Sequence, residues 1–426
     1  MSNPWDTLLR LWKIKELRNG LLFLLGMITV FRIAAHITVP GIDPSGLALF
    51  LESNQFLGLL NVFSGGTLES FSIVAIGVAP YITSSITFQL LGMIFPQVED
   101  MQKEAQGREK INRWTRWATA PLALVQGFGL ISIIQQQGGQ LGDGFNLAGF
   151  PLVVALFSMM AGTMLLMWLG ELISEKGIGN GISIIILAGI ISGLPAVIQQ
   201  IVATYTSADL FDVLLYIGLT LVTIVAVVVI NEGQRNIPVQ YARGVRGGAS
   251  QKIQSHLPMR VNLGGMIPII FAISIIVFPP LVAQFFADAR SEIVQRLAQW
   301  VITIFADNLF YGVLYFLLVF VFTFFYAAVI FRPDQVAENL QKQGGFIPGV
   351  RPGEQTERYI EWVRNRVLLG GATFLSIIAI LPLIVQEATG SPNLVVGGAS
   401  ILIVVAVIID MVKQVEAQMS MRNYEI

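Results

Sequence analysis

Residues 151–200 read PLVVALFSMMAGTMLLMWLGELISEKGIGNGISIIILAGIISGLPAVIQQ, and this stretch decides the fold class. It consists of two apolar runs, 151–173 and 178–200, separated by a short connection that holds Lys176. A helix that crosses a bilayer needs about 20 predominantly apolar residues, and each run has that length. We therefore expect two membrane-spanning helices joined by a tight turn.

The remainder of the chain repeats this pattern. Of its 426 residues, 54% are hydrophobic and only 12% are charged, whereas a soluble domain carries about 25% charged residues. The sequence thus predicts an all-α polytopic membrane protein. We expect ten spans, at 20–38, 72–95, 117–134, 151–173, 178–200, 211–231, 263–286, 308–331, 367–386 and 394–412.

The basic residues orient these spans. Of the 26 Lys and Arg residues, all but Arg32, Arg290 and Arg296 lie in the N-terminal segment, in an even-numbered connection or in the C-terminal segment. Loops rich in Lys and Arg stay on the cytoplasmic side, so both termini are expected there. Arg32 falls inside the first span.

Two cytoplasmic loops, 232–262 and 332–366, are far longer than a connection requires. Their basic residues could merely follow the charge rule for membrane proteins. The alternative is a docking platform for a large cytosolic partner, and the length of the loops favours this alternative.

Several functional classes lack their signatures here. The chain has no cysteine, and His36 and His256 stand apart from any acidic cluster, so we expect no metal site, no cofactor and no catalytic residue. A P-loop, an HExxH motif and a GxSxG motif are all absent from the sequence. Ion-coupled transporters usually place ionisable groups near the membrane midplane, where this chain offers only Arg32. A secondary transporter of a small solute remains the alternative function.

One segment, 56–70, is apolar but too short and too polar to cross the bilayer. It reads FLGLLNVFSGGTLES. Irregular backbone at membrane depth is tolerated only inside protein or beside a water-filled cavity. The segment is therefore either an external loop helix or a re-entrant segment. The glycines of KGIGNGIS (176–183) sit at a membrane boundary with no preceding strand, so they indicate close helix packing and not a nucleotide loop.

Five stretches carry a resemblance to a known family. They are NVFSGGTLESFSI (61–73), GVAPYITSSITFQLL (77–91), LMWLGELISEKGIGNGISIII (166–186), HLPMRVNLGGMIPIIFA (256–272) and GGFIPGVRPGEQTERYI (344–360). These runs resemble the SecY family, whose members form the central subunit of the bacterial protein-conducting channel.

The resemblance implies two pseudo-symmetric halves of five spans, 1–200 and 211–426, joined by a hinge loop at 201–210. An odd number of spans per half forces the halves into opposite orientations, so the repeat must be inverted. The segment 56–70 then corresponds to a re-entrant plug helix that blocks the pore.

The resemblance also assigns residues. Apolar pairs such as Val78 and Ile82 share one helix face, which by itself indicates only core or lipid contact. By resemblance the pore ring is Val78, Ile82, Ile182, Ile186, Ile270 and Ile403. The plug contains Asn61, Phe63, Ser64, Gly65, Gly66 and Leu68. The lateral gate, between the second and seventh spans, contains Thr83, Ser84, Thr87 and Gln89. Partner binding falls to Arg351, Arg243, Arg246 and Lys252.

The implied function is a passive channel in the bacterial cytoplasmic membrane. It would pass unfolded secretory polypeptides and release transmembrane segments sideways into the lipid bilayer. Its expected partners are the small membrane subunits SecE and SecG, the SecA motor ATPase, the ribosome, signal peptides and nascent chains.

Overall fold

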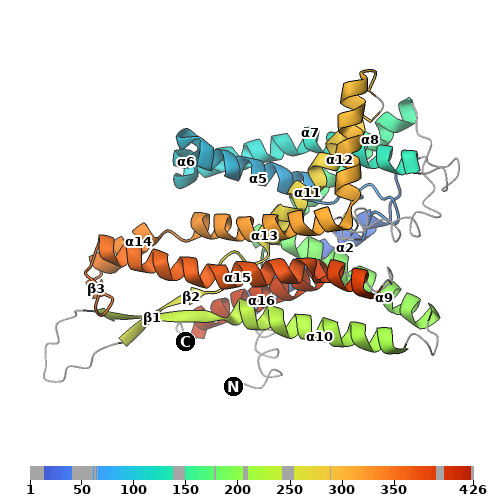
Figure 1. Cartoon of the computed structure of the whole chain (residues 1–426). Coiled ribbons are helices and arrows are strands. Elements are labelled where there is room, and N and C mark those ends of the chain that lie inside the picture. Colours follow the sequence, from blue (N-terminus) through green and yellow to red (C-terminus); the bar gives the residue numbers. More distant parts are fainter. Residues whose placement is uncertain are drawn as a thin grey trace, which may run out of the picture.

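The computed structural model is a bundle of long helices with a small sheet at one end (Figure 1). It describes residues 14–40, 61, 64, 66–137, 149–176, 179–204, 210–241, 254–287, 289–389 and 398–423.

The helices of the first half occupy the sequence up to the expected hinge. They are α2 (Lys15–Ala35), α5 (Ala79–Ile94), α6 (Pro96–Lys103), α7 (Ala105–Gln137), α8 (Phe150–Lys176) and α9 (Gly181–Thr204). The helices of the second half are α10 (Leu210–Glu232), α11 (Ile267–Phe285), α12 (Glu292–Ala306), α13 (Asn308–Ile330), α14 (Pro333–Lys342), α15 (Glu354–Thr389) and α16 (Gly398–Asn423). The hinge expected at 201–210 is helical at 201–204 and at Leu210, and its remaining residues lie outside the described part.

Each of the ten expected spans overlaps one long helix. By length and composition alone, six helices among the described residues could cross a membrane. The protein is therefore a multi-pass membrane protein. The second, sixth and eighth connections were expected on one side, and Figure 1 places α6, the sheet and α14 at the same end of the bundle.

Two helices begin later than their apolar runs. The run that starts at residue 72 becomes helical only at Ala79, and the run that starts at 263 only at Ile267. In both cases a proline occupies the first turn, where its missing N–H costs no hydrogen bond. The preceding turn contains a glycine in the left-handed region, Gly77 at φ 65° or Gly265 at φ 60°.

The two long loops each contribute to one sheet, which the sequence analysis did not anticipate. Strands β1 (Gln234–Tyr241) and β2 (Gln254–Arg260) pair antiparallel, and β3 (Gly345–Phe346) of the second loop joins the other edge of β1. Below them lies a separate apolar cluster whose buried members are Ile237, Val239, Met259, Leu340, Ile347, Ile360 and Val363. The loops thus form a packed unit and not two independent connections.

Contacts between the halves follow a simple pattern. Helix α11 packs on α5 and α7, and α16 packs on α9. The pairs α5–α11 and α9–α16 each join a span of the first half to the span five places later.

Candidate functional site

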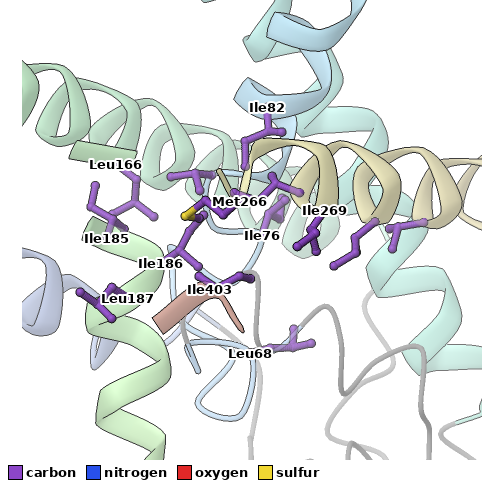
Figure 2. Close-up of a cluster of buried hydrophobic side chains, with 14 of the residues drawn as sticks. Leu68, Ile76, Ile82, Leu166, Ile185, Ile186, Leu187, Met266, Ile269 and Ile403 are labelled. Atoms are coloured by element: carbon purple, nitrogen blue, oxygen red, sulfur yellow. The ribbon is translucent and has the colours of Figure 1, made fainter. Parts of the chain in front are cut away.

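The expected ring residues come from four helices, and all but Ile182 are buried in one large apolar cluster. Val78, Ile82, Ile186, Ile270 and Ile403 are buried members of one apolar cluster. Figure 2 shows Ile186 and Ile403 together at the centre of this cluster, with Ile82 on one side. Because α5 and α9 belong to the first half and α11 and α16 to the second, both halves contribute to this cluster.

Val78 and Ile82 are placed by the start of α5. Val78 precedes the first helical residue, and the Ile82 N–H donates to the Val78 carbonyl oxygen at 3.1 Å. Residues four apart on a helix share one face, so both side chains point into the same region. The late start of α5 at Ala79 therefore sets where these two side chains lie.

Ile182 differs from the other ring residues. It is only partly buried, and a Cβ built on Gly170 of α8 would lie 3.0 Å from its Cγ1. Its position follows from the turn between α8 and α9, where the Asn180 Oδ1 accepts the Ile182 N–H at 3.1 Å. A Cβ on Gly181 would collide with the Gly170 carbonyl, which confirms that this glycine permits close helix packing.

Some members of the cluster were missed by the sequence analysis. Met266, Ile76, Ile185 and Ile269 are buried beside the expected residues (Figure 2). Met266 had a readable signal, because it lies four residues before Ile270, whose N–H donates to its carbonyl oxygen at 3.3 Å. Ile76 precedes the helix in an irregular stretch, where helical spacing gives no guide.

Three described residues of the segment 56–70 are buried. Ser64, Thr67 and Leu68 are at most 2% exposed, and Leu68 belongs to the apolar cluster, part of which is drawn in Figure 2. Burial of this degree favours the re-entrant alternative over an external loop helix. Phe63 and Gly65, expected in the same segment, lie outside the described residues.

Side-chain hydrogen bonds fold the re-entrant segment onto itself. Asn61 donates from Nδ2 to Glu69 Oε1 at 2.8 Å, and its Oδ1 accepts the Leu68 N–H at 3.3 Å. The Ser64 hydroxyl donates to the Asn61 carbonyl oxygen, and the Thr67 hydroxyl lies 2.9 Å from the carbonyl oxygens of Ser64 and Val74. The polar residues that made this segment unsuitable as a span thus satisfy its irregular backbone.

Hydrogen bonds join the end of the segment to the end of α2 and to the residues that follow it. The Ser70 hydroxyl donates to the Ala35 carbonyl oxygen at 2.9 Å, and the Val39 N–H donates to the Phe71 carbonyl oxygen at 3.0 Å. Phe71 is buried and has φ 40°, a left-handed conformation that costs a non-glycine residue about 1–3 kcal/mol. The surrounding contacts therefore hold this bend against its own strain.

On its other side the segment touches α9. A Cβ built on Gly66 would lie 3.7 Å from the Gly189 carbonyl oxygen and 3.9 Å from Ser192 Oγ. Gly66 adopts φ 75°, so a side chain at this position would be strained as well as crowded.

The polar residues expected at the lateral gate lie within α5, and two of them contact α7. The Ser84 hydroxyl donates to the Thr115 carbonyl oxygen at 2.9 Å, and the Thr83 hydroxyl accepts from Gln126 Nε2 at 3.3 Å. Thr87 is exposed and donates within its own helix, and Gln89 donates from Nε2 to the Ser85 hydroxyl at 3.2 Å.

An aromatic pair joins α7 to α11. The rings of Phe128 and Phe285 stack with their centroids 4.5 Å apart. A Cβ built on Gly129 would lie 3.0 Å from the Leu281 carbonyl oxygen, so the two helices approach closely at this point.

Arg351 is exposed in the turn between β3 and α15. The Thr356 hydroxyl donates to its carbonyl oxygen at 2.9 Å, which fixes the turn while leaving the guanidinium free to meet a partner. Arg243, Arg246 and Lys252 lie outside the described residues. Within the described part of the chain, no three His, Asp or Glu residues are grouped to hold a metal ion.

A polar cavity of about 200 Å³ lies where the sheet meets α11, α13 and α16. Its wall includes Arg260, Asp410 and the buried Asn262, whose Nδ2 donates to Asn231 Oδ1 at 2.6 Å and to the Gly265 carbonyl oxygen at 3.0 Å. Asn262 thus ties the end of α10 to the turn that begins α11.

Comparisons with known proteins identify relatives over nearly the whole chain. Three curated relatives, all described as protein translocase subunit SecY, come from Streptomyces coelicolor, Escherichia coli strain K12 and Thermotoga maritima. Their identities to this chain are 40%, 42% and 40%, and the alignments cover 98%, 96% and 99% of it and 98%, 93% and 97% of each relative.

Solved structures share the fold. One titled "The structure of a protein conducting channel" has a TM-score of 0.63 and 16% identity, covering 93% of this chain and 91% of the other. Another, titled "Sec61 in the Canine ribosome-channel complex from the endoplasmic reticulum", has a TM-score of 0.59 and 15% identity with the same coverage. The SecY family model matches residues 72–412. Together with the identities above, this match shows that the chain belongs to the SecY family.

Proposed function

We propose that this chain is a protein-conducting channel that passes unfolded secretory polypeptides through the apolar cluster between its two halves. The observation that carries the proposal is one apolar cluster that buries Val78, Ile82, Ile186, Ile270 and Ile403, from four helices and both halves, together with Leu68 of the re-entrant segment. A metabolite site would instead require convergent polar groups.

The chemistry of an apolar constriction suits a channel for polypeptides. Every kind of side chain must pass, so the wall should bind none of them tightly. A narrow apolar ring makes no strong polar bonds to a moving chain, and it resists wetting when the chain is absent. In this account the re-entrant segment acts as the plug, and Asn61, Ser64, Gly66 and Leu68 are its described members.

Lateral release requires the halves to separate along one seam. We place this gate between α5 and α11, with Thr83, Ser84, Thr87 and Gln89 as its polar residues. The bonds from Ser84 and Thr83 to α7 support a rigid unit of α5 and α7 that moves together. Separation from α11 then breaks the stack of Phe128 on Phe285 and the close packing of Gly129 against Leu281. A hydrophobic segment that enters the seam can replace these apolar contacts.

The sheet end of the bundle is the proposed docking platform. Arg351 projects from it, and basic loops suit both ribosomal RNA phosphates and acidic patches of a motor protein. We assign SecA and the ribosome to this face, with Arg243, Arg246 and Lys252 as further contacts. SecE and SecG are the proposed small subunits. The energy source lies in these partners, because the chain has no P-loop.

The orientation of the chain in the membrane follows from the distribution of its Lys and Arg residues. We place the sheet and both termini on the cytoplasmic side of a bacterial cytoplasmic membrane. The inverted halves at 1–200 and 211–426 are part of the same proposal, and the α5–α11 and α9–α16 contacts support them.

A reconstitution separates this function from the small-solute transporter, for which the comparisons give no support. The purified chain is placed in vesicles with SecE and SecG, and SecA, ATP and a secretory precursor are added outside. We expect ATP-dependent protection of the precursor from protease. Ion-coupled uptake of a small solute without precursor protection would contradict the channel.

A further inference from the structure

Helix α12 is an amphipathic helix whose packing on its neighbours leaves several large apolar side chains exposed. It reads EIVQRLAQWVITIFA and lies in the connection between α11 and α13. At 15 residues it is too short to span a bilayer. Membrane spanning therefore does not explain its apolar residues.

The helix carries three distinct faces. One packs on α11 and α13 through Ala298, which is 5% exposed, and through Phe305, whose ring meets Phe310 of α13 at 5.5 Å. The second face is polar and repeats at helical spacing in Glu292, Arg296, Gln299 and Thr303.

The third face is apolar and repeats at the same spacing. We call it the apolar stripe, and it consists of Ile293, Leu297, Trp300 and Ile304. Ile293, Leu297 and Trp300 are 73%, 59% and 62% exposed. A soluble surface seldom leaves large apolar side chains together in this way, so the stripe marks a contact surface.

The position of α12 indicates what covers the stripe. Figure 1 shows α12 crosswise to α13 and α15, near the end of α13 that is remote from the sheet. A helix that runs across the spanning helices at the end of the bundle lies along the membrane surface. Leu309 and Val313, near the start of α13, are also exposed, at 77% and 55%.

We propose that α12 is an interfacial helix whose apolar stripe is seated in the headgroup region of the leaflet opposite the sheet. Amphipathic helices of this kind bury an apolar face about 5–10 Å into the boundary between headgroups and acyl chains. Trp300 belongs at that depth, where tryptophan is enriched. The polar face then meets water, and Arg296 and Glu292 form an ion pair there at 3.3 Å.

Contact of the stripe with lipid also constrains the helices on either side of α12. Because α12 joins α11 directly to α13, lipid contact at the stripe fixes the outer ends of both helices relative to the bilayer. Lipid in that leaflet thus becomes a binding partner of the channel, independently of what the channel transports. The chemical class of the partner is a phospholipid surface and not a second protein.

The chain is suited to a direct test because it contains no cysteine. Single substitutions Ile293→Cys, Leu297→Cys and Trp300→Cys mark the stripe, and Glu292→Cys, Gln299→Cys and Thr303→Cys mark the polar face as matched controls. Each full-length variant is labelled with a nitroxide and placed in vesicles of phosphatidylethanolamine and phosphatidylglycerol. Collision rates with oxygen, which concentrates in lipid, and with a water-soluble nickel complex are then measured.

We expect the ratio of oxygen to nickel collisions to be several-fold higher at all three stripe positions than at the three controls. Equal ratios on both faces, with strong nickel collisions throughout, would mean that the stripe lies in water and would overturn the proposal. Low collision rates with both reagents at the stripe would mean that protein covers it, which also overturns it. Using three positions per face keeps the test valid if one variant fails to fold.

Discussion

Arg32 and Ser192, 160 residues apart, are joined by a 2.6 Å hydrogen bond from Nη1 to Oγ. The bond links α2 to α9 and lies beside Gly66 of the re-entrant segment, whose Cβ position is 3.9 Å from the same hydroxyl. Arg32 is the basic residue that falls inside the first expected span. The bond gives the Arg32 guanidinium a polar partner inside the bundle, as an ionisable group within a span requires.

The first prediction follows from this bond. Ser192→Ala removes the acceptor of a charged donor, and bonds to charged groups contribute about 1.5–3 kcal/mol. Because Ser192 Oγ also lies 3.9 Å from the Cβ position of Gly66, loss of the bond should loosen the seat of the segment on α9. We therefore expect more plug opening at rest, by roughly tenfold if about 1.5 kcal/mol is lost. Resting conductance in a planar bilayer measures how often the plug opens.

Thr29→Val is the matched control, because the Thr29 hydroxyl donates to Leu25 within α2 and is exposed. This variant should conduct no more than the parent chain. A Ser192→Ala channel as tight as the Thr29→Val channel would show that the bond does not hold the plug.

The second prediction concerns Ile186, which is fully buried in the apolar cluster. Ile186→Asn places a polar group in the constriction, which helps water to enter, so ion leak through reconstituted vesicles should rise. Ile186→Val keeps the site apolar and should cost only about 0.5–1.5 kcal/mol of stability without adding leak. Equal permeability of the two variants, both folded, would rule out a sealing role for this position.

The third prediction compares two glycines of α9. A Cβ on Gly181 would collide with the Gly170 carbonyl of α8, whereas nothing lies within 4 Å of a Cβ on Gly193. Gly181→Ala should therefore lower stability by about 1–3 kcal/mol, the usual cost of overpacking. Gly193→Ala should leave stability unchanged or raise it by up to about 1 kcal/mol, because alanine favours a helix over glycine.

Thermal unfolding of both variants in detergent tests this comparison. If Gly181→Ala melts at the same temperature as Gly193→Ala, the α8–α9 approach is looser than described.

The fourth prediction concerns Arg351. Arg351→Glu reverses an exposed charge while the Thr356 hydroxyl still holds the carbonyl oxygen of the turn, so the fold should persist. We expect precursor translocation to be lost and membrane insertion of the chain to be normal. Arg296→Glu, a charge reversal at another exposed arginine, on α12, is the control and should translocate normally. Full activity of Arg351→Glu would exclude this turn from partner binding.

The membrane part of the fold was readable from the sequence because its signals are local. Runs of about 20 apolar residues and the alternation of basic loops identify helices without knowledge of any distant contact. The ring residue Ile403 is different, since its helix offers many apolar positions and only the resemblance selected this one.

The sheet could not be predicted in the same way, because the pairing of Gln240 with Phe346 joins segments about 100 residues apart. A local signal did exist: Ile237 and Val239 alternate with exposed neighbours, which is typical of a strand with one buried face. Helix α12 was overlooked for a related reason. A search for long apolar runs passes over a stripe that repeats every three or four residues.

The measurement that tests the central claim most directly is a crosslink between the apolar cluster and a polypeptide in transit. Because the chain has no cysteine, Ile82→Cys or Ile403→Cys provides a single reactive thiol in the proposed constriction. A precursor carrying one cysteine is stalled midway by a folded domain at its end, and oxidation is applied. Val225→Cys, exposed on α10, serves as the control position.

We predict disulfides from Ile82→Cys and Ile403→Cys to the stalled precursor and none from Val225→Cys. A precursor that is protected from protease, yet forms no disulfide with either cluster position or forms one equally with Val225→Cys, would contradict the account.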